Sequence, residues 1–295
     1  MPFYMPQDRL TQILTEEKGE LTVYCILKIL NNNALLAREA GDGSERILLG
    51  KGIGFGKRAG DEVGIDEGVQ VYTPVVREEQ RSTIHAVNAI DPVYIEAAGK
   101  IIEEAEKVFD SMNGDILLPL ADHLAFAARR ERENIFLSNP FIPDIKILFG
   151  KEYAVALESR KIIEQMTGYR ISDDEAGFIA LHIHSGLSDE AVSETLKATQ
   201  IIDESMQIIE DHLQKEMKKE SLSYIRLMSH LYYMVARAKA KEAVNIDLNE
   251  FVQEKYPEAM AVSELICRNM QEKLGIAVME EEIGFLAIHI QRMTA

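Results

Sequence analysis

DEAGFIALHI, residues 174–183, recurs 107 positions later as EEIGFLAIHI, residues 281–290. A second pair of segments has the same offset, because LADHL at 120–124 aligns with LMSHL at 227–231. Apolar residues in these segments recur three and four positions apart, the spacing of a helix that buries one face. Two segments repeated at one offset, with no gap between them, predict duplicated helical domains.

Four histidines occupy equivalent positions in the two copies. Within each copy the two histidines are 59 residues apart, and an arginine follows the first of them in both copies. A single histidine on a helix usually packs or caps, but a repeated polar pair indicates repeated chemistry. A neutral imidazole can attack a phosphoryl group and later pass it on. The candidate phosphorylation sites are His123, His182, His230 and His289.

The three other histidines do not follow the repeat. His184 is two residues from His182, which on a helix places its side chain on nearly the opposite face. We therefore predict that His184, His85 and His212 are surface or capping residues. The helix that carries His182 is expected to begin at a capping box, in which Ser172 accepts from first-turn amides and Glu175 reaches back.

The chain before residue 78 has a different pattern, typical of β-structure. Residues 22–30 and 34–38 are rich in apolar and β-branched side chains and are separated by three asparagines, which predicts strand, turn, strand. Residues 46–57 are expected to add one or two strands, and residues 69–72 a last short one. The prediction is a small antiparallel sheet, which gains stability from dimerisation because so short a domain buries little surface alone.

The segment GKGIGFGK, residues 50–57, does not fit a phosphate-binding loop. Lys51 stands where a P-loop needs its first glycine, and Arg58 where it needs serine or threonine. If the segment is a strand, alternate glycines leave one face bare while Lys51, Ile53, Phe55 and Lys57 share the other. Cations beside an aromatic ring suit RNA, whose phosphates and unstacked bases they contact. The alternative is a packed hairpin with Phe55 in its core.

Composition narrows the class of protein further. The net charge is −17, and nearly all of the excess acid lies after residue 77, so the helical copies are poor candidates for binding nucleic acid. Two cysteines, Cys25 and Cys267, cannot build a disulfide framework, which favours a reduced, cytoplasmic setting. The first 20 residues lack the apolar core of a signal peptide, and no segment reaches membrane-spanning length.

These motifs, in this order, resemble the BglG/SacY family of bacterial transcriptional antiterminators. The resemblance covers KILNNNALL at 28–36, GKGIGFGK at 50–57 and the two histidine-bearing repeats, and is nearest to the glucose-type members. It implies that the front module, as a dimer, binds an RNA hairpin in a leader transcript and so prevents termination. The positions that the family uses for RNA fall on Lys28, Asn31, Asn33, Gly50, Lys51 and Phe55. Lys51 stands where other members have arginine.

The resemblance also implies that the helical copies are regulation domains of the sugar phosphotransferase system. Their partners are then HPr and the EIIB-type domain of a sugar permease. Phosphorylation by the permease on the first copy would inactivate, and phosphorylation by HPr on the second would activate. The predicted limits are a leader at 1–20, the RNA-binding module at 21–77, and regulation domains at 88–190 and 191–295.

Two other hypotheses remain open at the level of sequence. The paired histidines, with acids such as Asp122 nearby, are compatible with an enzyme that carries or hydrolyses phosphoryl groups. The helical repeats are also compatible with a purely structural role in dimer contacts. In keeping with the resemblance, we expect no enzymatic activity and no cofactor. We also expect no metal site, because His182 and His184 cannot chelate one ion from a regular helix and no His-Asp dipeptide occurs.

Overall fold

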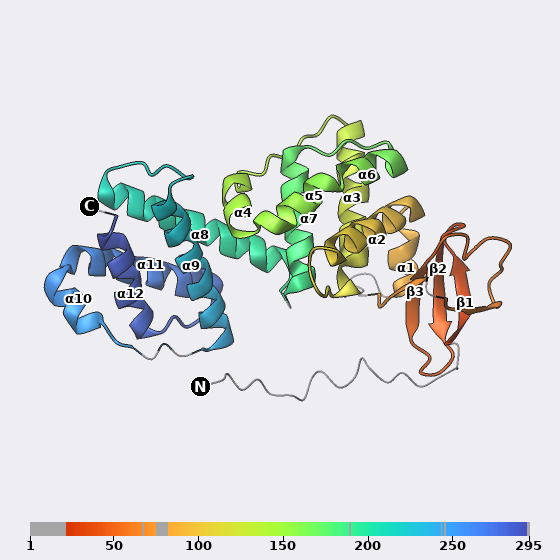
Figure 1. The fold of residues 1–295 in the computed structure, drawn as a ribbon, viewed down its shortest axis with the longest axis horizontal. Coiled ribbons are helices and arrows are strands. Elements are labelled where there is room, and N and C mark those ends of the chain that lie inside the picture. Colours follow the sequence, from red (N-terminus) through yellow and green to blue (C-terminus); the bar gives the residue numbers. More distant parts are fainter. Residues whose placement is uncertain are drawn as a thin grey trace. The chain divides into compact units, whose positions relative to one another are not determined.

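The structure, a computed structural model, describes residues 22–66, 68–74, 82–188, 190–242, 244 and 246–293. The predicted leader at 1–20 lies outside these residues. Contacts divide the chain into two compact units, Met1–Pro74 and Val75–Ala295. The first unit is a β module and the second is helical (Figure 1), so the predicted fold class is confirmed.

A five-stranded antiparallel sheet forms the first unit, with strand order β4-β1-β2-β3-β5. Its strands are β1 (Val23–Ile29), β2 (Ala34–Glu39), β3 (Glu45–Leu49), β4 (Glu62–Gly64) and β5 (Gln70–Tyr72). Alternation along the strands places Tyr24, Ile26, Leu35, Ala37 and Leu48 in one buried cluster. The strands expected at 22–30, 34–38 and 69–72 are confirmed, whereas β4 was not predicted.

A β-bulge interrupts β1 where the register shifts between Ile26 and Lys28. Ile26 pairs with Ala37, and Lys28 pairs with Leu36, the very next residue of β2. Without the extra residue, Lys28 would share the face of Tyr24 and Ile26 and point into the core. The bulge turns the lysine to the opposite face of the sheet.

The prediction that residues 46–57 form one or two strands is wrong beyond β3. Residues 51–56 are turns, and Gly52 and Gly56 have φ angles of 73° and 70°. These left-handed conformations are readily open to glycine and are not compatible with a strand. The side chains of this segment therefore do not alternate: Ile53 packs against the buried cluster of the sheet, while Phe55 is 74% exposed.

The helical unit contains two copies with the same order of helices, except that α5 and α6 of the first copy correspond to the single α11 of the second. The first copy comprises α2 (Pro92–Glu106), the 3₁₀ turn η3 (Gly114–Ile116), α3 (Leu117–Arg132), α4 (Ile142–Leu148), α5 (Gly150–Glu158), α6 (Arg160–Thr167) and α7 (Asp173–Leu187). The second comprises α8 (Val192–Leu213), α9 (Leu222–Ala240), α10 (Asn249–Lys255), α11 (Pro257–Leu274) and α12 (Glu280–Gln291), and the short α1 (Thr83–Asn88) precedes both. The 107-residue offset maps α4 onto α10 and α7 onto α12 at their first residues, which confirms the duplication.

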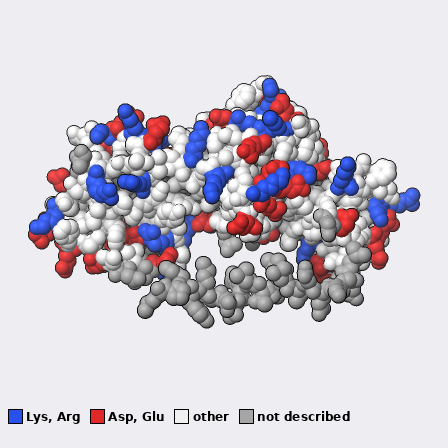
Figure 2. Space-filling model, viewed as in Figure 1, with Lys and Arg blue, Asp and Glu red and all other residues white. Residues whose placement is uncertain are grey.

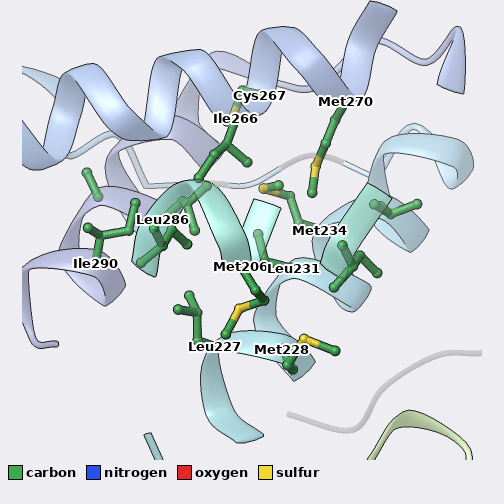
Figure 3. Close-up of a cluster of buried hydrophobic side chains, with 14 of the residues drawn as sticks. Met206, Leu227, Met228, Leu231, Met234, Ile266, Cys267, Met270, Leu286 and Ile290 are labelled. Atoms are coloured by element: carbon green, nitrogen blue, oxygen red, sulfur yellow. The ribbon is translucent and has the colours of Figure 1, made fainter. Parts of the chain in front are cut away.

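Each copy has an apolar core, and that of the second is rich in methionine. Met206, Met228, Met234 and Met270 converge there with branched side chains of α9, α11 and α12 (Figure 3). Methionine is unbranched and polarisable, so it fills irregular gaps between helices.

Equivalent glycines allow the last helix of each copy to approach its short neighbour. A Cβ atom on Gly177 would lie 2.3 Å from Cδ1 of Ile142, and one on Gly284 would lie 2.6 Å from Oδ1 of Asn249. Real Cβ atoms do not approach other atoms this closely. A larger residue at either position would therefore have to displace the facing side chain, where α4 crosses α7 and where α10 crosses α12.

The capping box predicted at the start of α7 forms only in part. The hydroxyl of Ser172 accepts from the amide of Glu175 at 3.2 Å, as predicted. The expected reach of Glu175 back to the cap is wrong, since its carboxylate turns towards α3 instead. At the equivalent start of α12, Met279 gives no side-chain cap and three glutamates occupy the first turn.

Acidic and basic side chains are interspersed on the face drawn in Figure 2. Within the part of the chain that the structure describes, none of the helices combines the length and the apolar character needed to cross a bilayer.

Candidate functional site

Two loops of the β module are joined by hydrogen bonds. The amide of Gly50 donates to the carbonyl of Asn33 at 2.9 Å, and the amide of Gly52 donates to Oδ1 of the same asparagine at 2.9 Å. The amide of Asn33 in turn donates to Oδ1 of Asn31 at 2.8 Å. At least one oxygen of each predicted RNA-binding asparagine therefore shapes the loops. Their role here includes positioning the glycine-rich turns.

Gly54 lies where the two loops are closest. Its amide donates to the carbonyl of Asn32 at 2.9 Å, and a Cβ atom at Gly54 would lie 2.3 Å from the carbonyl oxygen of Asn31. Because that oxygen belongs to the backbone, a larger residue at 54 would force the loops apart.

The joined loops present cations and one aromatic ring to solvent. Lys51, Lys57 and Arg58 are exposed beside Phe55. The structure thus keeps Lys51 and Phe55 accessible, as predicted, although they lie on turns and not on a strand. Lys28 is half-buried, on the sheet face to which the bulge turns it. The sequence analysis did not include Arg58 among the candidate RNA-binding residues. Its position directly after Lys57, which makes a pair of adjacent cations, could have indicated it.

In the first helical copy, both candidate histidines lie beside an ion pair. The ring centroids of His123 on α3 and His182 on α7 are 5.1 Å apart. Nε2 of His123 is 3.0 Å from Oε2 of Glu175, and Nη2 of Arg130 donates to Oε1 of that carboxylate at 2.7 Å. The structure therefore brings the two histidines together and adds an arginine and a glutamate to them.

Glu175 places a negative charge between His123 and Arg130 in the first site. Burial alone would raise the pKa of its carboxyl, but the contacts with His123 and Arg130 outweigh burial and hold the pKa below its ordinary value. Nε2 of His123 and Oε2 of Glu175 are 3.0 Å apart, but their geometry is not that of a hydrogen bond, so this contact is an electrostatic one.

The second copy contains the same four residues in a different arrangement. Glu282 is 3% exposed and binds Arg237 through both oxygens, at 2.6 Å to Nε and 3.0 Å to Nη2. The rings of His230 and His289 stack with centroids 4.3 Å apart. Nε2 of His230 has no hydrogen-bond partner among the described residues, and the same holds for Nε2 of His123. The glutamate thus contacts the arginine here, whereas in the first copy it contacts both arginine and histidine.

A pocket of about 380 Å³ opens onto the second site. Its lining comprises His230, Arg237, Val244, Glu282, Phe285 and His289. Burial, with help from His289 and Arg237, lowers the pKa of His230 to about 3, so its imidazole is neutral at pH 7. Burial also lowers the pKa of His289. A neutral ring facing an open pocket with a guanidinium nearby can accept a phosphoryl group, and the guanidinium can bind it.

The remaining histidines lie apart from these sites. His85 is exposed on α1, and His212 lies in the last turn of α8, in agreement with the prediction for both. The prediction for His184 is wrong. Its side chain is only 13% exposed and contacts Glu152 and Tyr232, because it faces the second copy and not solvent. No group of three or more histidine, cysteine, aspartate or glutamate side chains in the described part of the chain could hold a metal ion.

The two glutamates are the functional candidates that sequence reasoning missed. Glu175 and Glu282 obey the 107-residue offset, as the arginines do. The offset was therefore enough to identify both glutamates as candidates. They were missed because the sequence analysis assigned Glu175 to the capping box.

Comparison with known proteins agrees with this architecture. The family model described as CAT RNA binding domain matches residues 24–81, and the model described as PRD domain matches residues 99–186 and 203–293. The chain thus combines an RNA-binding module of the CAT class with two PRD domains.

Curated relatives have the same extent. The chain is 30% identical over 272 residues to the beta-glucoside operon antiterminator of Dickeya chrysanthemi, which covers 91% of this chain and 96% of the relative. It is 31% identical over 275 residues to the PtsGHI operon antiterminator of Bacillus subtilis (strain 168), covering 92% and 97%. A crystal structure of GlcT CAT-PRDI has 32% sequence identity and a TM-score of 0.48, and covers 56% of this chain and 99% of that one. The chain belongs to the BglG/SacY family of transcriptional antiterminators.

Proposed function

We propose that this chain is a cytoplasmic, RNA-binding transcriptional antiterminator under the control of the sugar phosphotransferase system. As a homodimer it binds a hairpin in the leader mRNA of a sugar operon and prevents an overlapping terminator from forming. The support is the combination of an RNA-binding module with two helical copies that each hold a histidine pair beside an arginine.

The RNA surface that we propose is the joined loop pair of the β module together with Lys28. Lys28 and Lys51 supply charge for phosphates, and Phe55 supplies a ring on which an unstacked base can lie. Asn31, Asn33 and Gly50 shape the loops and present backbone groups to the RNA. Dimerisation brings two copies of each proposed cation to one RNA hairpin.

The histidine pairs are the proposed phosphorylation sites. A lone pair on the imidazole attacks the phosphorus of a phosphohistidine on HPr or a phosphocysteine on an EIIB-type domain. A new P–N bond forms as the donor's P–N or P–S bond breaks, and the donor leaves with the bonding electrons. Each phosphoryl group adds roughly two negative charges. It competes with Glu175 for Arg130, or with Glu282 for Arg237, so the ion pair must rearrange.

The two copies would respond to different donors because their sites differ. In the first copy, Glu175 already contacts His123, whereas His230 of the second faces a pocket. We propose, with the family, that permease phosphorylation of the first copy inactivates and HPr phosphorylation of the second activates. The enzyme hypothesis is not favoured, since the relatives are named as regulators.

Phosphoryl labelling tests the four histidines directly. After incubation of the full chain with phosphorylated HPr or a phosphorylated EIIB-type domain, we expect phosphate on members of the two pairs, mapped by peptide mass spectrometry. Replacing His123 and His182 by alanine should abolish labelling of the first copy. A His85→Ala variant, altered on the exposed α1, should label normally. Label on His85 or His212, or release of phosphate that continues past one equivalent per site, would contradict the proposal.

Gly54→Ala tests the loop pair as the RNA surface. The added Cβ meets a backbone oxygen, so we expect a stability loss of about 1–3 kcal/mol, typical of overpacking, and at least a tenfold loss of RNA affinity in a gel shift. Gly41→Ala is the matched control, because a Cβ there meets nothing within 4 Å and φ is not in the left-handed region. Equal affinity of both variants would remove the loop pair from the RNA interface.

A further inference from the structure

The first helical copy packs directly against the second. Ile147 and Leu148 of α4 pack onto the core of the second copy. Beside them Asp144 is fully buried, with Oδ1 3.3 Å from Nζ of Lys219 and 3.3 Å from the hydroxyl of Tyr224. A buried carboxylate of one copy is therefore held by donors of the other, namely the buried Tyr224 and the partly exposed Lys219.

His184 lies at the centre of a second group of contacts between the copies. Its Nδ1 is 3.0 Å from Oε1 of Glu152, and its Nε2 is 3.1 Å from the hydroxyl of Tyr232 on α9. A neutral imidazole satisfies both partners if Nδ1 donates to the carboxylate and the tyrosine hydroxyl donates to Nε2. Burial raises the pKa of Tyr232 to about 12, which keeps the phenol protonated as a donor. The ring of Phe149 packs against the imidazole, with the two ring centroids 4.2 Å apart.

The residues of this contact break the internal repeat. At the 107-residue offset, His184 corresponds to Gln291, Tyr232 to Ala125 and Glu152 to Ala259. The phosphorylation candidates, by contrast, are the same in both copies. A difference between duplicated copies is expected where one copy contacts the other, since the two partners cannot both use the same face.

Both helices that meet at this contact also carry a candidate phosphorylation site. On α7, His182 faces α3 and His184, two residues later, faces the second copy. On α9, His230 faces α12 and Tyr232, again two residues later, faces the first copy. Two residues along a helix turn the side chain by about 200°, so each helix has the site on one side and the contact on the other.

We propose that the hydrogen bond between His184 and Tyr232 couples the two histidine pairs, so that a phosphoryl group on one copy changes the conformation of the other. This inference rests on the phosphorylation proposed above. A helix is a rigid element, and close-packed contacts do not absorb a displacement gradually. A shift of α7 that accommodates a phosphoryl group beside His182 therefore displaces His184 against Tyr232. By linkage, a shift of α9 acts on the first copy by the same factor.

The interface itself is tested first, without phosphorylation. Tyr232→Phe keeps the ring but removes the donor to Nε2 of His184. Hydrogen exchange of the amides of α7 and α9 in the full chain should become about tenfold faster, the effect of one lost buried hydrogen bond. Tyr233→Phe is the matched control, because this neighbouring tyrosine is 59% exposed. Unchanged exchange in Tyr232→Phe would overturn the role of the hydrogen bond.

The coupling is tested in a full chain in which His85, His212, His230 and His289 are all replaced by glutamine, so that the histidines that remain lie in the first copy. Potassium phosphoramidate is the phosphoryl donor, which needs no protein partner, and peptide mass spectrometry reports the label. The methyl NMR signals of Met228 and Met234, buried on α9, report the second copy. Labelling should shift both signals, and Tyr232→Phe should abolish the shift while Tyr233→Phe preserves it.

The outcomes separate this inference from the function on which it rests. Label on the first copy with no shift of either methyl signal would overturn the coupling and leave the proposed function intact. A shift that persists in Tyr232→Phe would overturn the assignment to this hydrogen bond. Absence of label on His123 and His182 would overturn the phosphorylation of the first copy and the coupling together.

Discussion

Replacing Phe55 by alanine is expected to lower the affinity for the leader hairpin by about 5- to 150-fold per protomer. Stacking of one base on an aromatic side chain contributes about 1–3 kcal/mol, which corresponds to that range of affinity. The ring is 74% exposed and lies between exposed cations, so its loss removes a binding contact and not a core residue. A gel shift with a dimeric protein should show a larger combined effect.

The control for Phe55→Ala is a measurement of the free energy of unfolding of this variant. Truncation of an exposed side chain usually changes the free energy of unfolding by no more than about 0.5 kcal/mol. Val71→Ala, at an apolar residue of β5 that is 40% exposed, should alter neither stability nor RNA affinity. If Phe55→Ala unfolds the module as a core substitution would, the packed-hairpin hypothesis is correct and the stacking role is wrong.

Arg237→Met is expected to be the most destabilising change at the histidine sites, by about 3–5 kcal/mol. It leaves the carboxylate of Glu282, which is 3% exposed, buried without its bidentate partner. Glu282→Gln should cost less, because the Arg237 side chain that remains is 30% exposed and can be solvated. Arg130→Met should also cost less, since Glu175 retains its contact with His123.

The thiol of Cys267 provides a local measurement of this effect. It is 2% exposed in the core of the second copy, whereas Cys25 lies in the β module. Labelling of Cys267 by a thiol reagent should accelerate in Arg237→Met in proportion to the lost stability, while labelling of Cys25 should not change. Unchanged labelling of Cys267 in Arg237→Met would show that the ion pair between Arg237 and Glu282 contributes nothing to the stability of the second copy.

The duplicated helices could be predicted because the patterns that indicate them lie in the order of residues along the chain. Apolar spacing and a constant offset survive in the order of residues, so the equivalence of α7 with α12 and of the four histidines followed directly. The strands β1, β2 and β5 followed from local alternation in the same way. The three-residue strand β4 was missed because it is too short to carry a periodic pattern and forms only by pairing with β1.

Features that depend on partners distant in sequence could not be predicted. The bulge in β1 is set by pairing with β2, and it places Lys28 on the face of Leu36 and not on the face of Ile26. The glycine-rich segment alternates in sequence, yet its turns are fixed by amide bonds to the asparagine loop. His184 was assigned to the surface because it lies on nearly the opposite helix face from His182, and the tyrosine that hydrogen-bonds to it lies 48 residues further along the chain.

By itself, the sequence determined the β module, the two homologous helical copies and the four histidines within them, because periodicity and repetition are properties of the chain's order. Only the tertiary structure decided that one glutamate contacts its histidine while its equivalent binds arginine alone, and that the two copies meet at His184. Equivalent residues lie on equivalent helices but have different neighbours. Their contacts, and hence their chemistry, depend on three-dimensional packing that the 107-residue repeat does not encode.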